Sequence, residues 1–387
     1  MPTFSKSSVR SIEELLDDGP ETCLFYDTMK KIQKFRSIRD VSEYLLSFSK
    51  EHLDRIDKLE QLIKEYQDLI NNNHPINQLI VAKSVSKWIF YTNKIEFLGT
   101  KLEGDTEEIV SKGYSIHKTR TEKEVLQTLK LLKTTYSEDI YNSKEPELKI
   151  SFDTEKIKYW HTILVQDIEP TAGNFRKSLA YSDNMNGSIY KFPHHSIVQK
   201  AIPDLCELIY RMIKYISKTY ITSNRKLQYT IALASFAQFH FVDIHPFKDG
   251  NGRMCRFISK RMLDWVLPLP VPMFLDRNKY LKALEDARLP NTMPDSPLSL
   301  YKLVIDECIS QYKEILQIYK GIIFKDLIVA KSEEDLKYQL RGKTYSNISE
   351  ELIELFRNLN DDDTVDRKTE NMIIRIKKCP EICIDDI

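Results

Sequence analysis

The residues best suited to chemistry lie in one short stretch of the sequence, HPFKDGNGRMCR at positions 245–256. His245 can accept a proton near neutral pH, because the unperturbed pKa of histidine is about 6.5. Asp249 offers hard oxygen ligands, of the type that hold Mg²⁺ together with substrate phosphates. A base and a magnesium ligand four residues apart suggest phosphoryl-transfer chemistry.

The second half of the same stretch has the parts of an anion site. Gly250, Asn251 and Gly252 leave room for backbone N–H groups to approach a phosphate before the chain turns into a helix. Arg253 and Arg256 are three positions apart, so they share one face of that helix and can donate to phosphate oxygens. The alternative that requires no function is a polar helix N-terminus with a solvated basic face.

These residues resemble the signature of the Fic family, H-P-F-x-D/E-G-N-G-R-x-x-R, at all nine specified positions of the twelve. The resemblance implies an enzyme that transfers AMP from ATP to a Ser, Thr or Tyr hydroxyl of a target protein, with Mg²⁺ as cofactor. His245 would be the catalytic base and Asp249 the metal ligand. The residues that would bind the nucleotide are Gly250, Asn251, Gly252, Arg253 and Arg256. Removal of AMP from a target is the alternative direction, and some relatives transfer UMP, phosphate or phosphocholine.

A second segment, TNKIEF at 92–97, resembles the inhibitory segment of the same family, S/T-x-x-x-E-G/N. The resemblance implies that Glu96 pairs with Arg256 and keeps ATP from seating its γ-phosphate productively. The physical reason is independent of the family, because a carboxylate that occupies a guanidinium competes with phosphate for the same donors. Phe97 departs from the pattern, since glycine or asparagine is usual there. An ordinary exposed helix charge is the alternative for Glu96.

Residues 173–198 contain several helix breakers and a short extended run from Ser188 to Phe192. They are similar to the G-x-Y/F-R segment of the Fic family and the two-stranded flap that follows it. The resemblance implies that Ser188 and Ile189 lie over the active site, where an extended strand could pair with a target peptide. An ordinary surface hairpin is the alternative.

Three further residues have expected places. In a helix predicted at 276–287, the resemblance implies that Tyr280 contacts the adenine, although the usual acidic, glycine-containing turn after this helix is replaced by RLPN at 288–291. His161 and His240 lie on apolar helix faces, so both are expected to be core histidines rather than catalytic groups.

The elements that must position these residues are helices. Apolar residues recur at spacings of three and four and there are only ten glycines, which favours an all-α protein. We expect a Fic-type helical core with a short β-hairpin flap and with flanking N- and C-terminal helices. The expected divisions are 1–75, 76–320 and 321–387. Helices are predicted at 77–98, 121–143, 153–165, 195–219, 224–243, 253–267, 276–287 and 298–318, with a loop at 100–120 and further helices near 347–358 and 367–377.

Composition and net charge indicate which partners and which cellular location to expect. Lysine plus arginine and aspartate plus glutamate both total 57, which argues against nucleic acid or an anionic membrane as the main partner. Six scattered cysteines and the absence of a signal-peptide pattern at the start favour a cytoplasmic location, with a nuclear one also compatible.

Apolar residues from Ile56 to Ile70 fit either a coiled-coil arm for a homodimer or an amphipathic helix packed on the chain, and the packed helix is preferred. The second functional hypothesis is an ATP-binding regulator or scaffold that performs no transfer.

Overall fold

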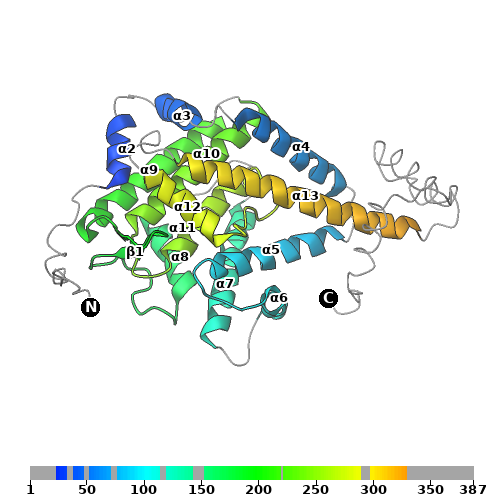
Figure 1. Cartoon of the computed structure of the whole chain (residues 1–387), viewed down its shortest axis with the longest axis horizontal. Coiled ribbons are helices and arrows are strands. Elements are labelled where there is room, and N and C mark those ends of the chain that lie inside the picture. Colours follow the sequence, from blue (N-terminus) through cyan, green and yellow to red (C-terminus); the bar gives the residue numbers. More distant parts are fainter. Residues whose placement is uncertain are drawn as a thin grey trace, which may run out of the picture. The chain divides into compact units, whose positions relative to one another are not determined.

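A computed structural model describes residues 23–32, 38–47, 52–70, 76–113, 119–142, 152–218, 221–288 and 297–328. In these ranges the chain is helical apart from one antiparallel hairpin, which confirms the expected all-α class with a short flap (Figure 1). The helices are α2 (Leu24–Ile32), α3 (Ile38–Ser47), α4 (Leu53–Ile70), α5 (Ile76–Lys94), α6 (Glu103–Lys112), α7 (Arg120–Asn142), α8 (Thr154–Val165), α9 (His195–Lys218), α10 (Ser223–Ile244), α11 (Asn251–Leu263), α12 (Arg277–Arg288) and α13 (Leu298–Ile328).

The hairpin consists of β1 (Tyr181–Asp183) and β2 (Ile189–Lys191), with Ser182 opposite Tyr190. The chain separates into two compact units, residues 1–61 with 81–309 and residues 62–80 with 310–387. The signature, the inhibitory segment and the hairpin all belong to the first unit. The expected division at 75/76 and 320/321 stays a prediction.

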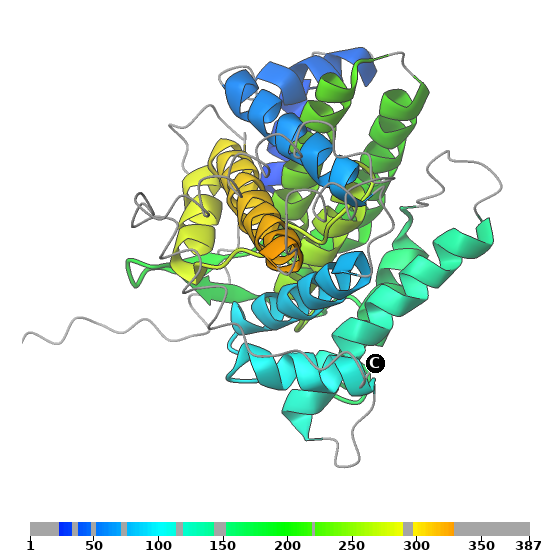
Figure 2. The same cartoon turned by 90° about the vertical axis from the view of Figure 1, so that its right-hand side faces the viewer.

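Helix α10 is the centre of the first unit. Its residues from Leu227 to Ile244 are all buried, as expected for a helix that is apolar almost all round. It packs against α11, α9, α3 and α2, while α6 and α7 pack against each other at the edge drawn in cyan and teal in Figure 2. Because α10 is enclosed on all sides, the residue that follows its last turn, His245, is delivered to a fixed place.

The predicted loop at 100–120 is wrong for its first half, where the structure has α6. Glu103 and Asp105 in the first turn and Lys112 in the last complement the helix dipole, and Gly113 ends the helix in the left-handed conformation at φ 68°. Glycine is common in loops, but here Gly113 serves as a helix C-cap. The helices predicted near 347–358 and 367–377 lie outside the described residues.

The apolar face of α4 is turned into the chain. Ile56, Leu59, Ile63 and Tyr66 are all buried, which agrees with the packed amphipathic helix. A homodimer stays a prediction, and so does the cytoplasmic location. No helix within the described ranges combines the length and apolarity needed to cross a bilayer.

Candidate active site

The signature loop begins where α10 ends. His245 adopts a left-handed conformation, φ 51°, because Pro246 cannot continue the helix. Arg176, from the segment before the hairpin, holds this turn: its Nε donates to the His245 carbonyl at 2.6 Å, and its backbone N–H donates to the Pro246 carbonyl at 2.9 Å. Its other guanidinium nitrogens donate to the carbonyls of Ser178, Ile244 and Pro193. Arg176 is therefore the buried residue that joins the flap to the turn at His245.

Asn251 closes the loop from the other side. Its side-chain Oδ1 accepts from the Phe247 N–H at 2.9 Å and its Nδ2 donates to the Phe247 carbonyl at 2.8 Å. Phe247 itself is fully buried, as expected for a side chain that plugs inward. The Asn251 side chain is thus engaged in holding the loop, and its contact with a nucleotide stays a prediction.

His161 on α8 supports the middle of the loop. Its Nδ1 accepts from the Gly173 N–H at 2.9 Å, so its Nε2 carries the proton and donates to the Asp249 carbonyl at 2.9 Å. The ring stacks on Phe247 at 3.6 Å, and burial lowers its pKa to about 4. The expectation of a core histidine with satisfied nitrogens is confirmed, and the structure adds that this histidine positions the Asp249 backbone.

Gly250 and Gly252 are required for different reasons. Gly250 is the N-cap of α11 at φ 78°, a conformation that favours glycine, and its N–H donates to the Asp249 Oδ1 at 2.6 Å. Gly252 has no such strain, but a Cβ there would lie 2.0 Å from the Glu96 Oε1. A carboxylate oxygen therefore already lies against the N-terminus of α11, where the amides and the helix dipole favour an anion.

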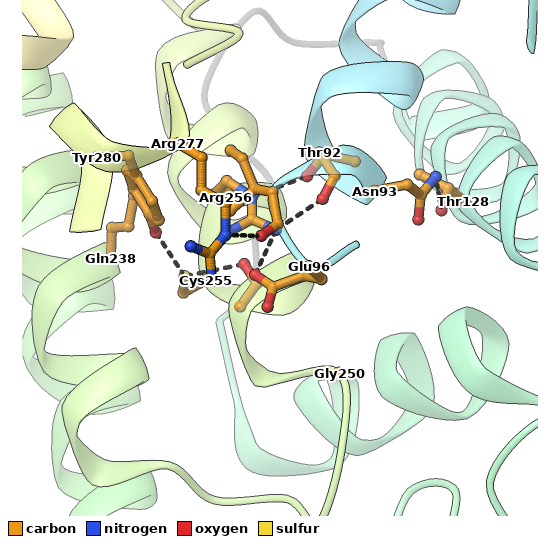
Figure 3. A network of polar contacts seen from close by, with 12 residues as sticks. Thr92, Asn93, Glu96, Thr128, Gln238, Gly250, Cys255, Arg256, Arg277 and Tyr280 are labelled. Atoms are coloured by element: carbon orange, nitrogen blue, oxygen red, sulfur yellow. Dashed lines mark hydrogen bonds and ion pairs between the residues drawn. The ribbon is translucent and has the colours of Figure 1, made fainter. Parts of the chain in front are cut away.

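Arg256 is held by the inhibitory segment (Figure 3). Its Nη2 pairs with the Glu96 Oε1 at 2.8 Å and donates to the Thr92 carbonyl at 2.7 Å, while its Nε donates to the Thr92 Oγ1 at 3.0 Å. Burial lowers the pKa of Arg256, but the Glu96 carboxylate, together with Tyr280 and Cys255, more than offsets this and the net shift is upward. The expected contact between Glu96 and Arg256 is therefore present.

Arg253, one turn earlier on α11, has a different environment. It is 1% exposed, and its Nε, Nη1 and Nη2 are all buried with no hydrogen-bond partner among the described residues. Burial lowers its pKa, and the charges of Asp249, Glu124 and Glu96 offset this only in part. A buried guanidinium without partners is costly, and an anionic ligand would satisfy it.

The inhibitory segment leaves its helix earlier than predicted. Helix α5 ends at Lys94, and Glu96 follows in a turn, so Thr92 and Glu96 meet Arg256 from a helix end and a turn respectively. Phe97 is left-handed at φ 57°, which explains physically why glycine or asparagine suits this position. Arg277 lies beside it: its Nε donates to the Ile95 carbonyl at 2.7 Å and its Cζ lies 4.2 Å from the centre of the Phe97 ring.

The His245 side chain is covered by the segment that follows β2. The Phe192 ring stacks on the His245 imidazole with centroids 3.8 Å apart and planes 19° apart. The His245 Nδ1 lies 3.2 Å from the Val242 carbonyl, so Nδ1–H donates and Nε2 keeps its lone pair. Burial lowers the pKa of His245 to about 3, and the charges of Arg176 and Arg288 act in the same direction. The imidazole is consequently neutral at physiological pH.

The two flap residues named from the sequence lie on the hairpin. Ile189 starts β2, opposite Asp183, and is 67% exposed. Ser188 is the last residue of the turn, where its backbone carbonyl accepts from the Asn184 N–H at 2.8 Å. Contact of either residue with a nucleotide or a target stays a prediction.

Tyr280 is buried deeper than its expected role suggests. It is 1% exposed, its hydroxyl accepts from the Gln238 Nε2 at 3.1 Å and lies 3.5 Å from the Cys255 Sγ, and its ring faces Arg256 at 5.4 Å (Figure 3). In this arrangement its direct contacts are with Arg256 and the core. Contact with an adenine would need a rearrangement and stays a prediction.

The donors present fit a magnesium ion held mainly by phosphates. No cluster of three or more His, Cys, Asp or Glu side chains able to hold a metal occurs in the parts of the chain that the structure describes. Mg²⁺ needs only one or two protein carboxylates when substrate phosphates supply the other ligands, and Asp249 lies at the N-terminus of α11 to provide one.

Sequence reasoning missed four residues that build the site. Nothing in the sequence indicates that Arg176 and His161 position the loop, because a hydrogen-bond partner far along the chain leaves no local pattern. Arg277 and Asp243 were not singled out at all. An arginine at the start of α12 and an aspartate in the last turn of an apolar helix were the available signals.

Comparison with known proteins gives the family. Residues 151–263 match the family described as Fic/DOC. A Fido domain-containing protein of Dictyostelium discoideum is 44% identical over 54 residues, covering 14% of this chain and 38% of that protein. A protein adenylyltransferase Fic of Drosophila erecta is 28% identical over 145 residues, covering 35% of this chain and 28% of that protein. The chain thus matches well under half the length of either relative.

Two solved structures share the fold. A Fic domain containing signaling protein from Bacteroides thetaiotaomicron superimposes with a TM-score of 0.52 at 17% identity, covering 68% of this chain and 98% of that one. A fragment of Fic-1 from C. elegans superimposes with a TM-score of 0.50 at 20% identity, covering 70% and 74% respectively. With the matched signature and hairpin in the same 113-residue range, the chain belongs to the Fic/DOC family through its residues 151–263.

Proposed function

We propose that this protein transfers AMP from ATP to a Ser, Thr or Tyr hydroxyl of a target protein and is inhibited by its own Glu96. The observation that carries the proposal is the buried, unpartnered guanidinium of Arg253 at the start of α11. A polyphosphate would supply the missing acceptors. The Drosophila erecta relative is a protein adenylyltransferase, which supports AMP as the group transferred.

In this mechanism the chain supplies position and charge. The Nε2 of His245 takes the proton of the target hydroxyl, whose oxygen forms a bond to the α-phosphorus in line with the departing pyrophosphate. Arg253, Arg256 and the amide of Gly252 neutralise the phosphate oxygens, while the Gly250 amide holds the Asp249 carboxylate. Asp249 would hold Mg²⁺, which supplies further neutralisation of the phosphate charge when bound.

Inhibition follows from competition for one guanidinium. Glu96 and Thr92 use three of the donor directions of Arg256. The Glu96 oxygen also lies against Gly252, at the amide end of α11. A phosphate that is to contact both Arg256 and this helix end must displace Glu96.

The test is transfer of label from α-labelled ATP with Mg²⁺ to the chain itself and to cell-extract proteins, comparing the wild type with His245→Ala. A positioned base contributes on the order of 10²–10⁴-fold, so labelling should fall by at least that range. Folding is checked by thermal unfolding of both proteins. Labelling by His245→Ala at the wild-type rate would refute the role of the base.

The same preparation separates the alternatives. A nucleotide sensor or scaffold would bind ATP, seen as a rise in unfolding temperature, without transferring label. An enzyme working mainly in reverse would release AMP from a labelled target. A panel of nucleotide donors identifies the group transferred.

A further inference from the structure

A buried carboxylate near the base has no part in the mechanism above. Asp243 lies in the last turn of α10, two residues before His245, and is 1% exposed. Its Oδ1 accepts from the Tyr190 hydroxyl at 2.6 Å and from the Arg288 Nε at 3.2 Å. Its Oδ2 is buried with no partner among the residues that the structure describes. A carboxylate is costly to bury, so this one calls for an explanation.

The three side chains come from three separate elements. Tyr190 is the middle residue of β2 in the flap, and Arg288 is the last residue of α12. The Arg288 guanidinium also lies over the flap, with its Cζ 3.9 Å from the centre of the Tyr190 ring. Asp243 therefore ties the flap and α12 to the helix that delivers the base.

A chain of ring contacts continues from this network to the base. Tyr190 and Phe192 meet edge to face with centroids 5.3 Å apart, and Arg288 lies 5.6 Å from the Phe192 ring. Phe192 in turn stacks on His245 at 3.8 Å. The strand that carries Tyr190 is thus the strand that places a ring on the imidazole.

Helix α12 holds the hairpin at its other end as well. The Met185 N–H, in the turn between β1 and β2, donates to the Glu285 Oε1 at 2.6 Å. This contact is exposed, so it contributes less than the buried Asp243 contacts. The turn and the second strand of the flap are therefore both attached to α12.

We propose that Asp243, Tyr190 and Arg288 form a positioning network that fixes the flap strand and holds the Phe192 ring on His245. This inference rests on the proposed function in one respect: the network positions a catalytic group only if His245 is the base. The geometry of the network and its effect on the His245 ring do not depend on that function.

The network sets the orientation of the base because the imidazole has few other restraints. Its own hydrogen bond is the 3.2 Å contact of Nδ1 with the Val242 carbonyl, and its broad face is covered by Phe192. The charged groups that act on it are Arg176, which holds the turn, and Arg288, which belongs to the network. A loosened flap would leave the ring free to rotate away from the attacking hydroxyl.

The first measurement is spectroscopic and needs no activity. In protein labelled with ¹³C-histidine, the His245 resonance is assigned with His245→Ala, and Phe192→Leu gives its position without ring stacking. Tyr190→Phe keeps the ring and removes only the hydroxyl that Asp243 accepts, and Arg288→Gln removes the charge. We expect the His245 resonance of both variants to move toward the Phe192→Leu position, and that of Arg288→Lys to move less.

The second measurement is the rate of self-labelling from α-labelled ATP in the Glu96→Gly background. Tyr190→Phe and Arg288→Gln should each lower the maximal rate about tenfold, because misplacement of a catalytic group costs rate rather than nucleotide binding. The half-saturating ATP concentration should change less than about twofold. The matched control is Tyr159→Phe, an exposed tyrosine on α8, which should change neither quantity.

The outcomes separate the two proposals. A lower unfolding temperature with an unmoved His245 resonance would mean that the network is merely structural and would overturn the inference. Absence of labelling in every variant, with the resonance moving as expected, would refute the proposed transfer and leave the positioning network standing. A moved resonance with an unchanged maximal rate would overturn the positioning role.

Discussion

Arg253 and Arg256 are one turn apart on the same helix, and both are almost completely buried, yet their surroundings are opposite. Arg256 has Thr92 and Glu96 as partners, and its pKa is raised despite burial, chiefly by the Glu96 carboxylate. Arg253 has no hydrogen-bond partner among the described residues, and burial lowers its pKa. Arg256 is therefore bound by side chains of the protein itself, whereas the Arg253 guanidinium is left with unused hydrogen-bond donors.

This difference suggests a division of roles. A site with both guanidinium groups unpartnered would be poorly stable, whereas a site with both occupied would bind no ligand. Occupying Arg256 alone leaves Arg253 as a fixed point for a phosphate and makes the second contact conditional on the movement of Glu96. The following predictions test each side of the comparison.

The largest expected effect is at Arg253. Arg253→Met should lower transfer by about 10²–10³-fold, the cost of removing one electrostatic contact to the transition state. Its unfolding temperature without nucleotide should stay equal or rise, because an unpartnered buried charge is replaced by an apolar side chain.

Arg256→Met should lose both activity and stability. The free energy of unfolding should fall by about 2 kcal/mol, less than for a fully buried ion pair because the Glu96 side chain is 36% exposed to solvent. Equal stability changes in the two variants, measured by thermal unfolding, would contradict the comparison.

The next effect is at Glu96. Glu96→Gly removes the carboxylate that competes with phosphate for Arg256, so transfer should rise by roughly 10–100-fold, the equivalent of a hydrogen bond to a charged group. Glu96→Gln keeps the shape without the charge and should give an intermediate rate. Both are measured as label transferred from α-labelled ATP at equal protein concentration. Unchanged rates in both variants would remove the inhibitory role and leave the catalytic one untouched.

A smaller effect is expected at Arg277, which contacts the residues on both sides of Glu96. Arg277→Ala removes the hydrogen bond to the Ile95 carbonyl and the contact with the Phe97 ring. The carboxylate should then be held less firmly, and transfer should rise by roughly fivefold, as for the loss of one net hydrogen bond. In the Glu96→Gly background the same change should have no further effect. Additive effects in the double variant would show that Arg277 acts elsewhere.

The smallest effect is at Phe97 and concerns stability. Its left-handed backbone at φ 57° is disfavoured for a bulky residue by about 1 kcal/mol or more, and its side chain is 78% exposed. Phe97→Gly should therefore raise the unfolding free energy by up to about 1 kcal/mol, less the lost contact with Arg277. Chemical denaturation measures this change. A loss of stability would mean that the contact with Arg277 outweighs the backbone strain.

Most of the region matched to the Fic/DOC family could be predicted from the sequence because its parts are local. The signature loop, the buried helix before it and the glycine-bearing turn follow from residues adjacent along the chain. The boundaries were less well predicted: α5 ends at Lys94 and not at residue 98, and α6 occupies an expected loop. In both cases the helix boundary depends on a cap or a tertiary contact, which the spacing of apolar residues does not reveal.

The sequence by itself determined the helical class, the order of the chemical groups along 245–256 and the presence of a carboxylate able to compete for an arginine. Only the tertiary structure showed that this carboxylate meets Arg256, as the family resemblance implies, that Arg253 has no partner among the described residues, and that Asp243, Tyr190 and Arg288 converge beside His245. The physical reason is that a pairing between side chains distant along the chain depends on how buried helices pack. That packing is set by the whole core and leaves no pattern within one segment.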